Sequence, residues 1–469
     1  LLACVLMLVY SQANVTSSSS ISGTFFYKEN LTWVSSLGIN YSLGVDGISL
    51  LLVVLTTLLT LVCIGASFRI DIKVKNYMAF MLLLSSGIIG VFLSTNLFLF
   101  YIFWEVMLIP AYFLVGSWGG ERRIYAAFKF VLYTSVGSLL MLAGIIAVGY
   151  YHQLAVGGAY TLELGTLLNG KLPVATQTWL FLAFAAAFAV KVPLVPFHSW
   201  LPDTYSEAPT PVTAMLAGAM SKAGAYGFLR FGLQLFPDAT HTLAPLFNVL
   251  AVIGILYCAL LALVQTDLKR LLGYSSISHL GVIMLGMFAL NTQGIEGSVL
   301  QMVNHGITTA ALFLIVGFIE VRTGTRNIRE LGGMAFRVPV LATVMLIVAL
   351  SSLGLPGLNS FAGEFLALLG AFRSSTIFGL LGTAVVIPAA WYLIRFFQGV
   401  MEGTRNKEGM LATRERKGLL SDINIGEALT LAPLLLLIFY IGIQPAPLTF
   451  ILEPSVAHVL QNLGVALIR

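Results

Sequence analysis

The stretch Ala-Ala-Ala-Phe-Ala-Val-Lys-Val-Pro-Leu-Val-Pro, residues 185–196, decides the fold. It lies inside an apolar segment, residues 176–206, that is longer than the roughly 20 residues a membrane helix needs. Pro193 and Pro196 remove two backbone donors, so this helix should be broken near its middle. Irregular backbone at membrane depth is tolerated only where protein or a water-filled cavity surrounds it. The presence of Lys191 at the break therefore predicts a polar pathway through a membrane protein.

The composition of the rest of the chain agrees with this prediction. Of 469 residues, 58% are hydrophobic and only 10% are charged, a balance that excludes a soluble globular domain. The expected fold is an all-α polytopic membrane protein with about thirteen membrane segments. Their bounds are about 1–13, 45–68, 76–94, 95–117, 122–148, 176–206, 208–236, 243–264, 266–290, 294–321, 338–374, 376–401 and 424–446. The first is too short to span a bilayer, so we expect part of a helix rather than a signal peptide.

The connections between segments and the cysteines limit the kinds of function that the chain can have. Residues 14–32 and 402–423 are expected to be exposed loops, the first polar and the second charged. Cys4, Cys63 and Cys258 are isolated in apolar segments, so disulfides, metal sites and iron–sulfur clusters are not expected. The net charge of +5 could suggest nucleic acid, but the basic residues lie in short connections, where membrane topology explains them better.

The basic residues of the connections predict an orientation. Sixteen lysines and arginines fall in alternate connections on one side, whereas only Lys28, Lys171 and Arg373 fall on the other. By the positive-inside rule, the rich side faces the cytoplasm or its topological equivalent, and the C-terminus lies on the opposite side. The expected location is the bacterial cytoplasmic membrane, with the inner mitochondrial and thylakoid membranes as alternatives.

A second long segment, residues 338–374, also carries a helix breaker, Gly354-Leu355-Pro356-Gly357. When the helices are grouped in fives, the broken helix is fourth in both groups, residues 76–236 and 243–401. Because five is odd, the two groups would insert with opposite orientations, which is the inverted-repeat plan of many transporters. The flanking parts are the N-terminal helices and loop, residues 1–75, and the charged loop, last membrane helix and amphipathic tail, residues 402–469.

Four ionisable residues lie in the middle of otherwise apolar segments: Glu105, Lys191, Lys222 and Glu364. A charge at the bilayer centre costs about 2.5 to 3.5 kcal/mol on insertion scales, so together they cost roughly 10 to 14 kcal/mol before any partner is counted. Charges kept at that cost indicate ion movement. The alternative for Glu105 is a structural ion pair, although a buried pair adds little net stability once desolvation is counted.

Weaker candidates accompany these four. His279 and His305 lie on apolar helices and could relay protons, although hydrogen-bonded interior histidines are common. Lys129 stands close enough to a helix end to extend its ammonium group to the interface. His198, beside the first break, could equally be a helix cap.

The candidates can be ordered along the chain as Glu105, Lys191, Lys222, then His279 or His305, then Glu364. Glu364 follows Pro356 by eight residues, about 12 Å of helix, which predicts a depth different from that of the break. Nucleotide-binding, triad and cofactor motifs are missing from the sequence, so the energy is expected from an ion gradient or a partner protein.

Six motifs spread along nearly the whole chain carry a family resemblance. They are Phe103-Trp104-Glu105, Ala189-Val190-Lys191-Val192-Pro193, His198-Ser199-Trp200-Leu201-Pro202-Asp203, Gln265-Thr266-Asp267-Leu268-Lys269-Arg270-Leu271-Leu272, Ser278-His279-Leu280-Gly281, and Gly354-Leu355-Pro356-Gly357 through Gly363-Glu364-Phe365. Together they resemble the antiporter-like subunits of respiratory complex I. The resemblance is greatest to the M-type branch, the counterpart of mitochondrial subunit four, because sister chains and most Mrp antiporter subunits carry lysine in place of Glu364.

The resemblance implies proton translocation driven by quinone reduction elsewhere in the complex, with Glu105 and Lys191 as a coupled pair, Lys222 central and Glu364 terminal. NADH, FMN, iron–sulfur clusters and quinone would bind to partner subunits. None of these cofactors is expected to bind to this chain. The implied partners are other membrane subunits of complex I, especially neighbouring antiporter-like chains, within the lipid bilayer. The opening helix of the family is expected to be missing here.

The tail after Pro454 is expected to form a short amphipathic helix lying on the membrane or on a neighbour. Its apolar face would carry Val456, Val459, Leu460, Leu463 and Leu467. Two other functions fit the same charges: a Mrp-type cation/proton antiporter subunit, which Glu364 disfavours, or a subunit of a related membrane-bound hydrogenase or ferredoxin-dependent complex. A third alternative is a purely architectural membrane subunit.

Overall fold

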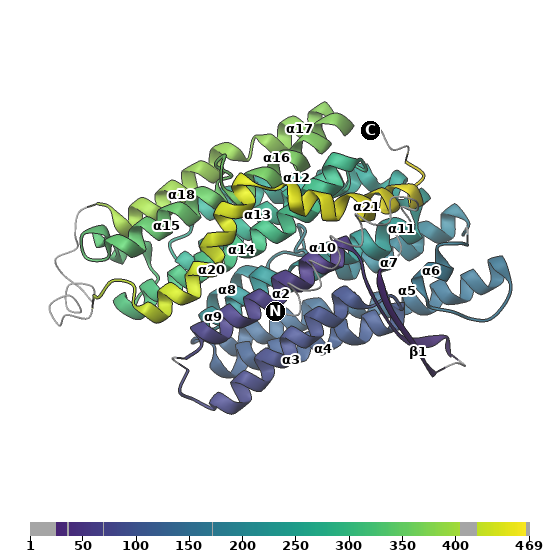
Figure 1. The fold of residues 1–469 in the computed structure, drawn as a ribbon, viewed down its shortest axis with the longest axis horizontal. Helices are drawn as coiled ribbons and strands as arrows, with labels where there is room; N and C mark the ends of the chain where they lie inside the picture. The colour runs from purple at the N-terminus through teal and green to yellow at the C-terminus, as the bar shows by residue number, and fades with distance from the viewer. Residues whose placement is uncertain (1–24, 35–36, 69, 171, 404–419, 466–469) are drawn as a thin grey trace.

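Long helices running side by side make up most of the molecule (Figure 1). The computed structural model describes residues 25–34, 37–68, 70–170, 172–403 and 420–465. The predicted segment 1–13, Cys4 and most of the loops 14–32 and 402–423 lie outside the described residues. Among the described residues, nine helices are long and apolar enough to cross a membrane. The predicted segments 208–236, 266–290 and 338–374 are not among these nine, and two of them are interrupted.

The first half of the chain contains helices α2 to α11 and a hairpin. The elements are β1 (Tyr27–Val34), β2 (Ile39–Val45), α2 (Gly47–Ala66), α3 (Val74–Leu93), α4 (Leu97–Trp118), α5 (Arg123–Val156), α6 (Leu164–Leu167), α7 (Val174–Lys191), α8 (Trp200–Glu207), α9 (Thr210–Met215), the π-helix η2 (Leu216–Met220), α10 (Lys222–Gly227), the π-helix η3 (Phe228–Gly232) and α11 (Leu233–Leu235).

The second half continues with helices of similar length. They are α12 (Pro237–Val264), α13 (Leu268–Met287), α14 (Thr292–Thr323), the 3₁₀ turns η4 (Ile328–Glu330) and η5 (Met334–Phe336), α15 (Pro339–Ser352), α16 (Asn359–Ser374), α17 (Thr376–Thr383), α18 (Val386–Met401), α20 (Ile425–Ile443) and α21 (Ala446–Asn462). Helix α14 is central: its apolar window is buried completely, and it packs against α2, α9, α13, α15, α16, α20 and α21.

One part of the fold was predicted wrongly, since the N-terminal region is not purely loop and the protein is not purely α-helical. Strands β1 and β2 pair antiparallel, with Tyr27 opposite Val45, and the hairpin stands at one end of the helices (Figure 1). Part of the predicted loop 14–32 is therefore strand. The alternating buried and partly exposed residues of Ile39–Val45 match the period of two that a strand requires.

Both predicted helix breaks are confirmed. Helix α7 ends at Lys191 and α8 begins at Trp200, while α15 ends at Ser352 and α16 begins at Asn359. The prolines in each gap cannot donate to the preceding turn, which explains why the helices stop there.

The structure also contains an interruption that was not predicted. Two π-helical turns, η2 and η3, flank the single α-helical stretch that begins at Lys222. The amide of Ser221 donates to the carbonyl of Leu216, five residues back, at 3.0 Å. Such π-turns are frequent at functional sites because they shift the register of the side chains that follow.

The C-terminal helix was predicted correctly in kind but not in extent or position. Helix α21 begins at Ala446, continues through Pro454, and buries Val456, Val459 and Leu460 against α2 and α14 of the same chain. The amide of Gly47 donates to Ser455 Oγ at 3.0 Å. The apolar face thus covers this chain's own helices rather than a membrane surface or a neighbour, while Leu467 lies outside the described residues.

Candidate functional site

Lys222 is the centre of the site. It is fully buried, and its ammonium group donates to the carbonyl of Ala217 at 2.6 Å and to Ser221 Oγ at 3.2 Å. Its Nζ also lies 2.9 Å from His305 Nδ1. Because the chain around it is π-helical, Lys222 can bond backwards to the turn that precedes it while contacting α14. The predicted base and one predicted histidine are therefore in direct contact.

The second histidine continues this arrangement. The rings of His305 and His279 lie 5.7 Å apart, and His279 Nδ1 is 2.7 Å from Glu364 Oε1. Gln301 Nε2 donates to the same carboxylate oxygen at 2.9 Å. Tyr392 OH lies 3.3 Å from His279 Nε2. Both histidines, rather than one of them, thus lie between Lys222 and Glu364.

The predicted depth of Glu364 is wrong. A β-carbon built on Gly354, inside the break, would lie only 3.0 Å from Glu364 Oε2. Side chains of a helix point towards its N-terminus, and α16 begins only five residues before Glu364, at Asn359. The carboxylate therefore reaches back to the break instead of lying a helix length beyond it.

Lys191 is buried and Glu105 is partly buried, and the two side chains make no direct contact with each other. Lys191 is 1% exposed, and its ammonium group lies over the rings of Trp104 at 5.5 Å and Phe130 at 5.3 Å. Neither Lys191 Nζ nor Glu105 Oε1 has a hydrogen-bond partner in the described part of the chain. The ion pair implied by the resemblance is therefore not formed in this conformation.

Lys129 and His198 lie beside the break in the first broken helix. Lys129 Nζ donates to Asp203 Oδ2 at 2.7 Å and to the carbonyl of Ser199 at 3.0 Å. Asp203 also accepts a bond from Arg270 at 2.8 Å, which ties α8 to α5 and α13. The N-cap position of α8 is Ser199, and His198 Nδ1 is buried without a hydrogen-bond partner among the described residues.

Several polar residues of the site were not predicted. Gln301 lies one helical turn before His305 on α14, a spacing that could have revealed it. Tyr392 on α18 had no signal in the sequence. A buried ion pair also joins Arg230 to Asp46 at 2.6 Å, although the two are 184 residues apart. Arg230 is a lone charge in an apolar segment, which was its signal.

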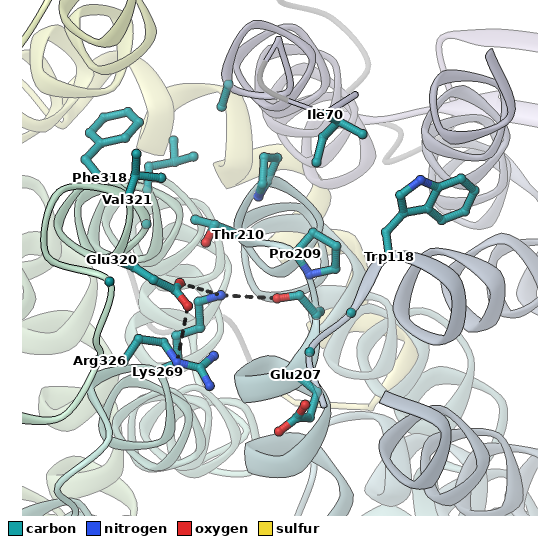
Figure 2. A pocket seen from close by; sticks show the side chains of 18 of the residues that line it. Ile70, Trp118, Glu207, Pro209, Thr210, Lys269, Phe318, Glu320, Val321 and Arg326 are labelled. Carbon is teal, nitrogen blue, oxygen red and sulfur yellow. Dashed lines mark hydrogen bonds and ion pairs between the residues drawn. The ribbon is translucent and has the colours of Figure 1, made fainter. Parts of the chain in front are cut away.

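A cavity of about 910 Å³ opens at the end of the helices that carries most of the basic connections. Figure 2 shows the Lys269 ammonium group at its wall, between the Glu320 carboxylate and a main-chain carbonyl. Lys269 Nζ lies 3.4 Å from Glu320 Oε2 and donates to the carbonyl of Ala208 at 3.2 Å. Lys269 was assigned to a connection from sequence, yet its side chain is only 4% exposed.

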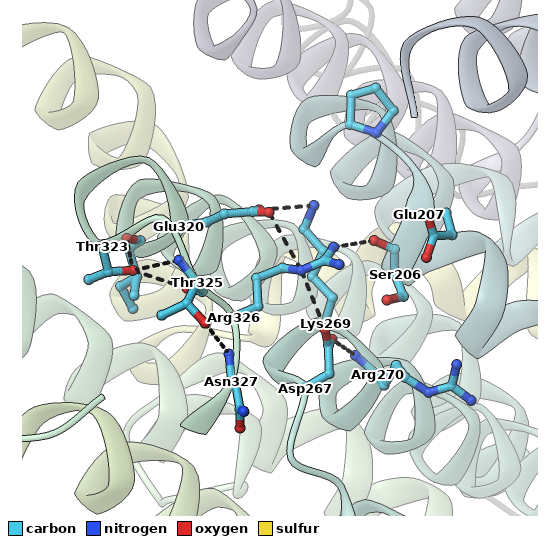
Figure 3. A network of polar contacts seen from close by, with 12 residues as sticks. Ser206, Glu207, Asp267, Lys269, Arg270, Glu320, Thr323, Thr325, Arg326 and Asn327 are labelled. Atoms are coloured by element: carbon cyan, nitrogen blue, oxygen red, sulfur yellow. Dashed lines mark hydrogen bonds and ion pairs between the residues drawn. The ribbon is translucent and has the colours of Figure 1, made fainter. Parts of the chain in front are cut away.

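Arg326 extends this polar network, shown in Figure 3. Its Nε lies 3.3 Å from Asp267 Oδ2 and 3.5 Å from Glu320 Oε1, and its guanidinium donates to the carbonyl of Ser206. Lys269 and Arg326 thus hold carbonyls at the C-terminal end of α8, where cations are favourable because of the helix dipole. The network therefore anchors α8, the part of the first broken helix that follows the break.

Comparison with known proteins identifies the family. Residues 94–387 match the family described as "NADH:quinone oxidoreductase/Mrp antiporter, TM". The chain is 41% identical to NADH-quinone oxidoreductase subunit M of Rhodobacter capsulatus over 449 residues, covering 93% of this chain and 85% of that protein.

Two solved structures share the fold. A chain of respiratory complex I from Thermus thermophilus with bound NADH aligns with a TM-score of 0.87 and 31% identity, covering 98% of this chain and 94% of that one. A chain of the Mrp complex from Dietzia sp. DQ12-45-1b aligns with a TM-score of 0.79 and 22% identity, over 98% of this chain and 94% of that one, which shows the fold alone. The chain therefore belongs to the NADH:quinone oxidoreductase/Mrp antiporter membrane family, in its subunit M branch.

Proposed function

We propose that this chain is the proton-translocating, antiporter-like membrane subunit of an NADH-quinone oxidoreductase, in which quinone reduction elsewhere in the complex drives protons through its buried Glu, Lys and His residues. The similarity to NADH-quinone oxidoreductase subunit M supports this proposal. The single observation that carries it is the series Lys222, His305, His279 and Glu364, in which each group lies beside the next.

The chemistry of these four groups suits proton transfer. A neutral imidazole carries one donor and one acceptor nitrogen, so a histidine can take a proton on one side and release it on the other. Lys222 would hand its proton to His305 across 2.9 Å, and His279 would deliver it to Glu364 across 2.7 Å. The two rings, 5.7 Å apart, would exchange the proton through a bridging water or a small rotation.

Glu105 and Lys191 would act earlier in the sequence of events. When they approach, each stabilises the charge of the other, and when they separate, a buried lysine is more easily neutral. The conformation described here would be the separated one. Lys191 is the last residue of α7, next to the helix break, so a small movement there would open or close the pair. Lys129, bound to Asp203, would follow movement of α8.

The wider arrangement follows the same proposal. Residues 76–236 and 243–401 would be the two inverted repeats, and the cavity beside Lys269 would open towards the cytoplasm, with the C-terminus on the other side of a bacterial membrane. Neighbouring antiporter-like chains would be the partners. NADH, FMN, iron–sulfur clusters and quinone would be bound by other subunits.

A cation/proton antiporter subunit is the second candidate, because an Mrp chain shares the fold. Glu364 argues against it, since the resemblance places lysine there in most such subunits. Purification in mild detergent separates the two. Co-purifying flavin and iron–sulfur proteins support the complex I proposal, whereas their absence from an intact assembly would contradict it.

The proposal is tested by Lys222→Met in the complete complex. The variant should assemble, because methionine fills a similar volume without a charge, but proton pumping in vesicles should be abolished or strongly reduced. Lys75→Met, which removes an exposed charge at the start of α3, is the control and should pump normally. Normal pumping by the Lys222 variant, at the parent's ratio of protons to electrons, would overturn the proposal.

A further inference from the structure

The helix that carries Lys222 leads to a second set of polar groups in the opposite direction from His305. Tyr226 and Arg230 follow Lys222 at intervals of four residues, so all three lie along one side of the helix. Arg230 Nε donates to Tyr226 OH at 3.2 Å, which shows that this spacing survives the π-turn η3. The row runs from the centre of the molecule towards the end with the β-hairpin, where Asp46 follows β2.

Arg230 is held firmly at this position. It bonds to Asp46 Oδ2 at 2.6 Å, and its guanidinium group lies over the rings of Phe25 at 5.0 Å and Tyr226 at 5.3 Å. The side chains of Arg230 and Asp46 are 4% and 3% exposed. A buried ion pair gains little net stability after desolvation, so stability alone is a weak reason for keeping this pair.

The hydrogen bonds of Tyr226 do not allow a proton to pass from Lys222 through Tyr226 to Arg230. Its hydroxyl donates to the carbonyl of Phe92 at 2.8 Å and accepts from Arg230. Passing a proton onwards requires a neighbour that can accept one, and the guanidinium group of Arg230 has donors only. It also keeps its positive charge at every physiological pH and repels an incoming proton.

The contrast with the other neighbour of Lys222 is chemical. His305 contains a ring that can accept and donate in turn, whereas the Tyr226–Arg230 couple cannot. Arg230 bonds to Tyr226 OH through Nε and to Asp46 Oδ2 through Nη2, so its guanidinium group joins the hydroxyl to the carboxylate. A proton leaving Lys222 along its own helix would reach Tyr226 and then the positive guanidinium group that its hydroxyl contacts.

We propose that Arg230, held between Tyr226 and Asp46, is a proton barrier that closes Lys222 off from the hairpin end and so directs its proton to His305. This inference rests on the proposed function, since it assumes that Lys222 carries a proton. The relay itself does not use the buried Arg230–Asp46 pair. The inference gives this pair a role, which is to prevent protons from leaking back across the membrane through Lys222.

The test is the passive proton leak of vesicles that contain the complete complex, without NADH and with the membrane potential clamped by potassium and valinomycin. The variant Arg230→Gln with Asp46→Asn removes both charges but keeps a polar pair, and asparagine is as good a helix cap as aspartate. An imposed pH difference should decay at least several-fold faster than in the parent. An unchanged rate would overturn the inference.

The molecule offers a matched control in a second buried pair. Arg322 and Glu427 lie 2.5 Å apart with side chains 4% and 5% exposed, but they are not on the helix of Lys222. Arg322→Gln with Glu427→Gln should leave the leak unchanged, and an equal leak in this control would contradict a specific barrier. Adding Lys222→Met to the leaky variant should restore the parent rate. A leak that persists without Lys222 would be a packing defect and would also overturn the inference.

Single substitutions keep the test decisive if the double variant does not assemble. Arg230→Lys retains a cation that can only donate, so its proton leak should equal that of the parent. Arg230→His introduces a ring that can accept and donate, so its proton leak should be faster. Equal leaks in the two would refute the barrier. Failure of the proposed function has a different signature, because Lys222→Met alone would then pump normally whatever the leak.

Discussion

The two halves of the molecule hold their buried charges in opposite ways. In the second half, Lys222 contacts His305 and Glu364 contacts His279, and the two histidine rings lie 5.7 Å apart. In the first half, Lys191 Nζ and Glu105 Oε1 are buried, and neither has a hydrogen-bond partner among the described residues. The second half therefore needs a bridging water or a rotation only between its two rings, whereas both groups of the first half must move or be bridged by water before they interact.

This difference explains why the two broken helices need not work alike. The break after α15 places Gly354 against the Glu364 carboxylate, so it shapes a group that is already connected. The break after α7 leaves Lys191 over two aromatic rings, a contact worth about 2 kcal/mol for a desolvated cation. That energy is small enough for a nearby carboxylate to compete with it. We infer that the first half switches while the second half conducts.

The largest expected effect on proton pumping comes from replacing Glu364, the last group of the proposed relay. Glu364→Gln keeps the size of the side chain and can still accept from Gln301, but an amide cannot take up a proton near neutral pH. Pumping should fall roughly a hundredfold or more, the usual contribution of a positioned proton-transfer group. Glu364→Asp keeps the carboxyl group and should retain much more activity. Equal activity of the two variants in vesicles would contradict this role.

A smaller effect, below the roughly hundredfold loss of a proton-transfer group, is expected for Glu105 and Lys191, because they act on Lys222 indirectly. Glu105→Gln should reduce pumping, and Glu105→Asp, which keeps the charge, should do so much less. If the pair works as a switch, Glu105→Gln combined with Lys191→Met should cost far less than the sum of the single losses. Additive losses would show that the two residues act separately.

The smallest expected effect on proton pumping comes from a substitution at the second helix break. Gly354 has φ +78°, and a β-carbon there would lie 3.0 Å from Glu364 Oε2, so Gly354→Ala should displace the carboxylate and slow pumping a few-fold. Gly357 is the matched control: its φ is +92°, but nothing lies within 4 Å of a β-carbon. Both variants should lose about 1 kcal/mol of stability from backbone strain. Pumping that falls equally in both would assign the effect to strain alone.

Sequence predicted the membrane class and both helix breaks, and it singled out the ionisable residues of the proposed relay, because a charge or a proline in an apolar segment is conspicuous. It did not predict that both histidines lie between Lys222 and Glu364, since helix packing decides which faces meet. The position of Glu364 was misjudged because its side chain points back along α16. The Arg230–Asp46 contact spans 184 residues, a separation at which sequence holds no geometric information.

The central claim is that the groups from Lys222 to Glu364 form one working relay. The most direct test removes its middle link and leaves both ends in place. His305→Leu in the complete complex is predicted to assemble and to contain both Lys222 and Glu364, yet to translocate fewer protons for each electron pair passed to quinone, as measured by quenching of a pH-sensitive dye in vesicles against NADH oxidation. An unchanged ratio of protons to electrons in this variant would show that the protons do not pass through His305 and would contradict the account.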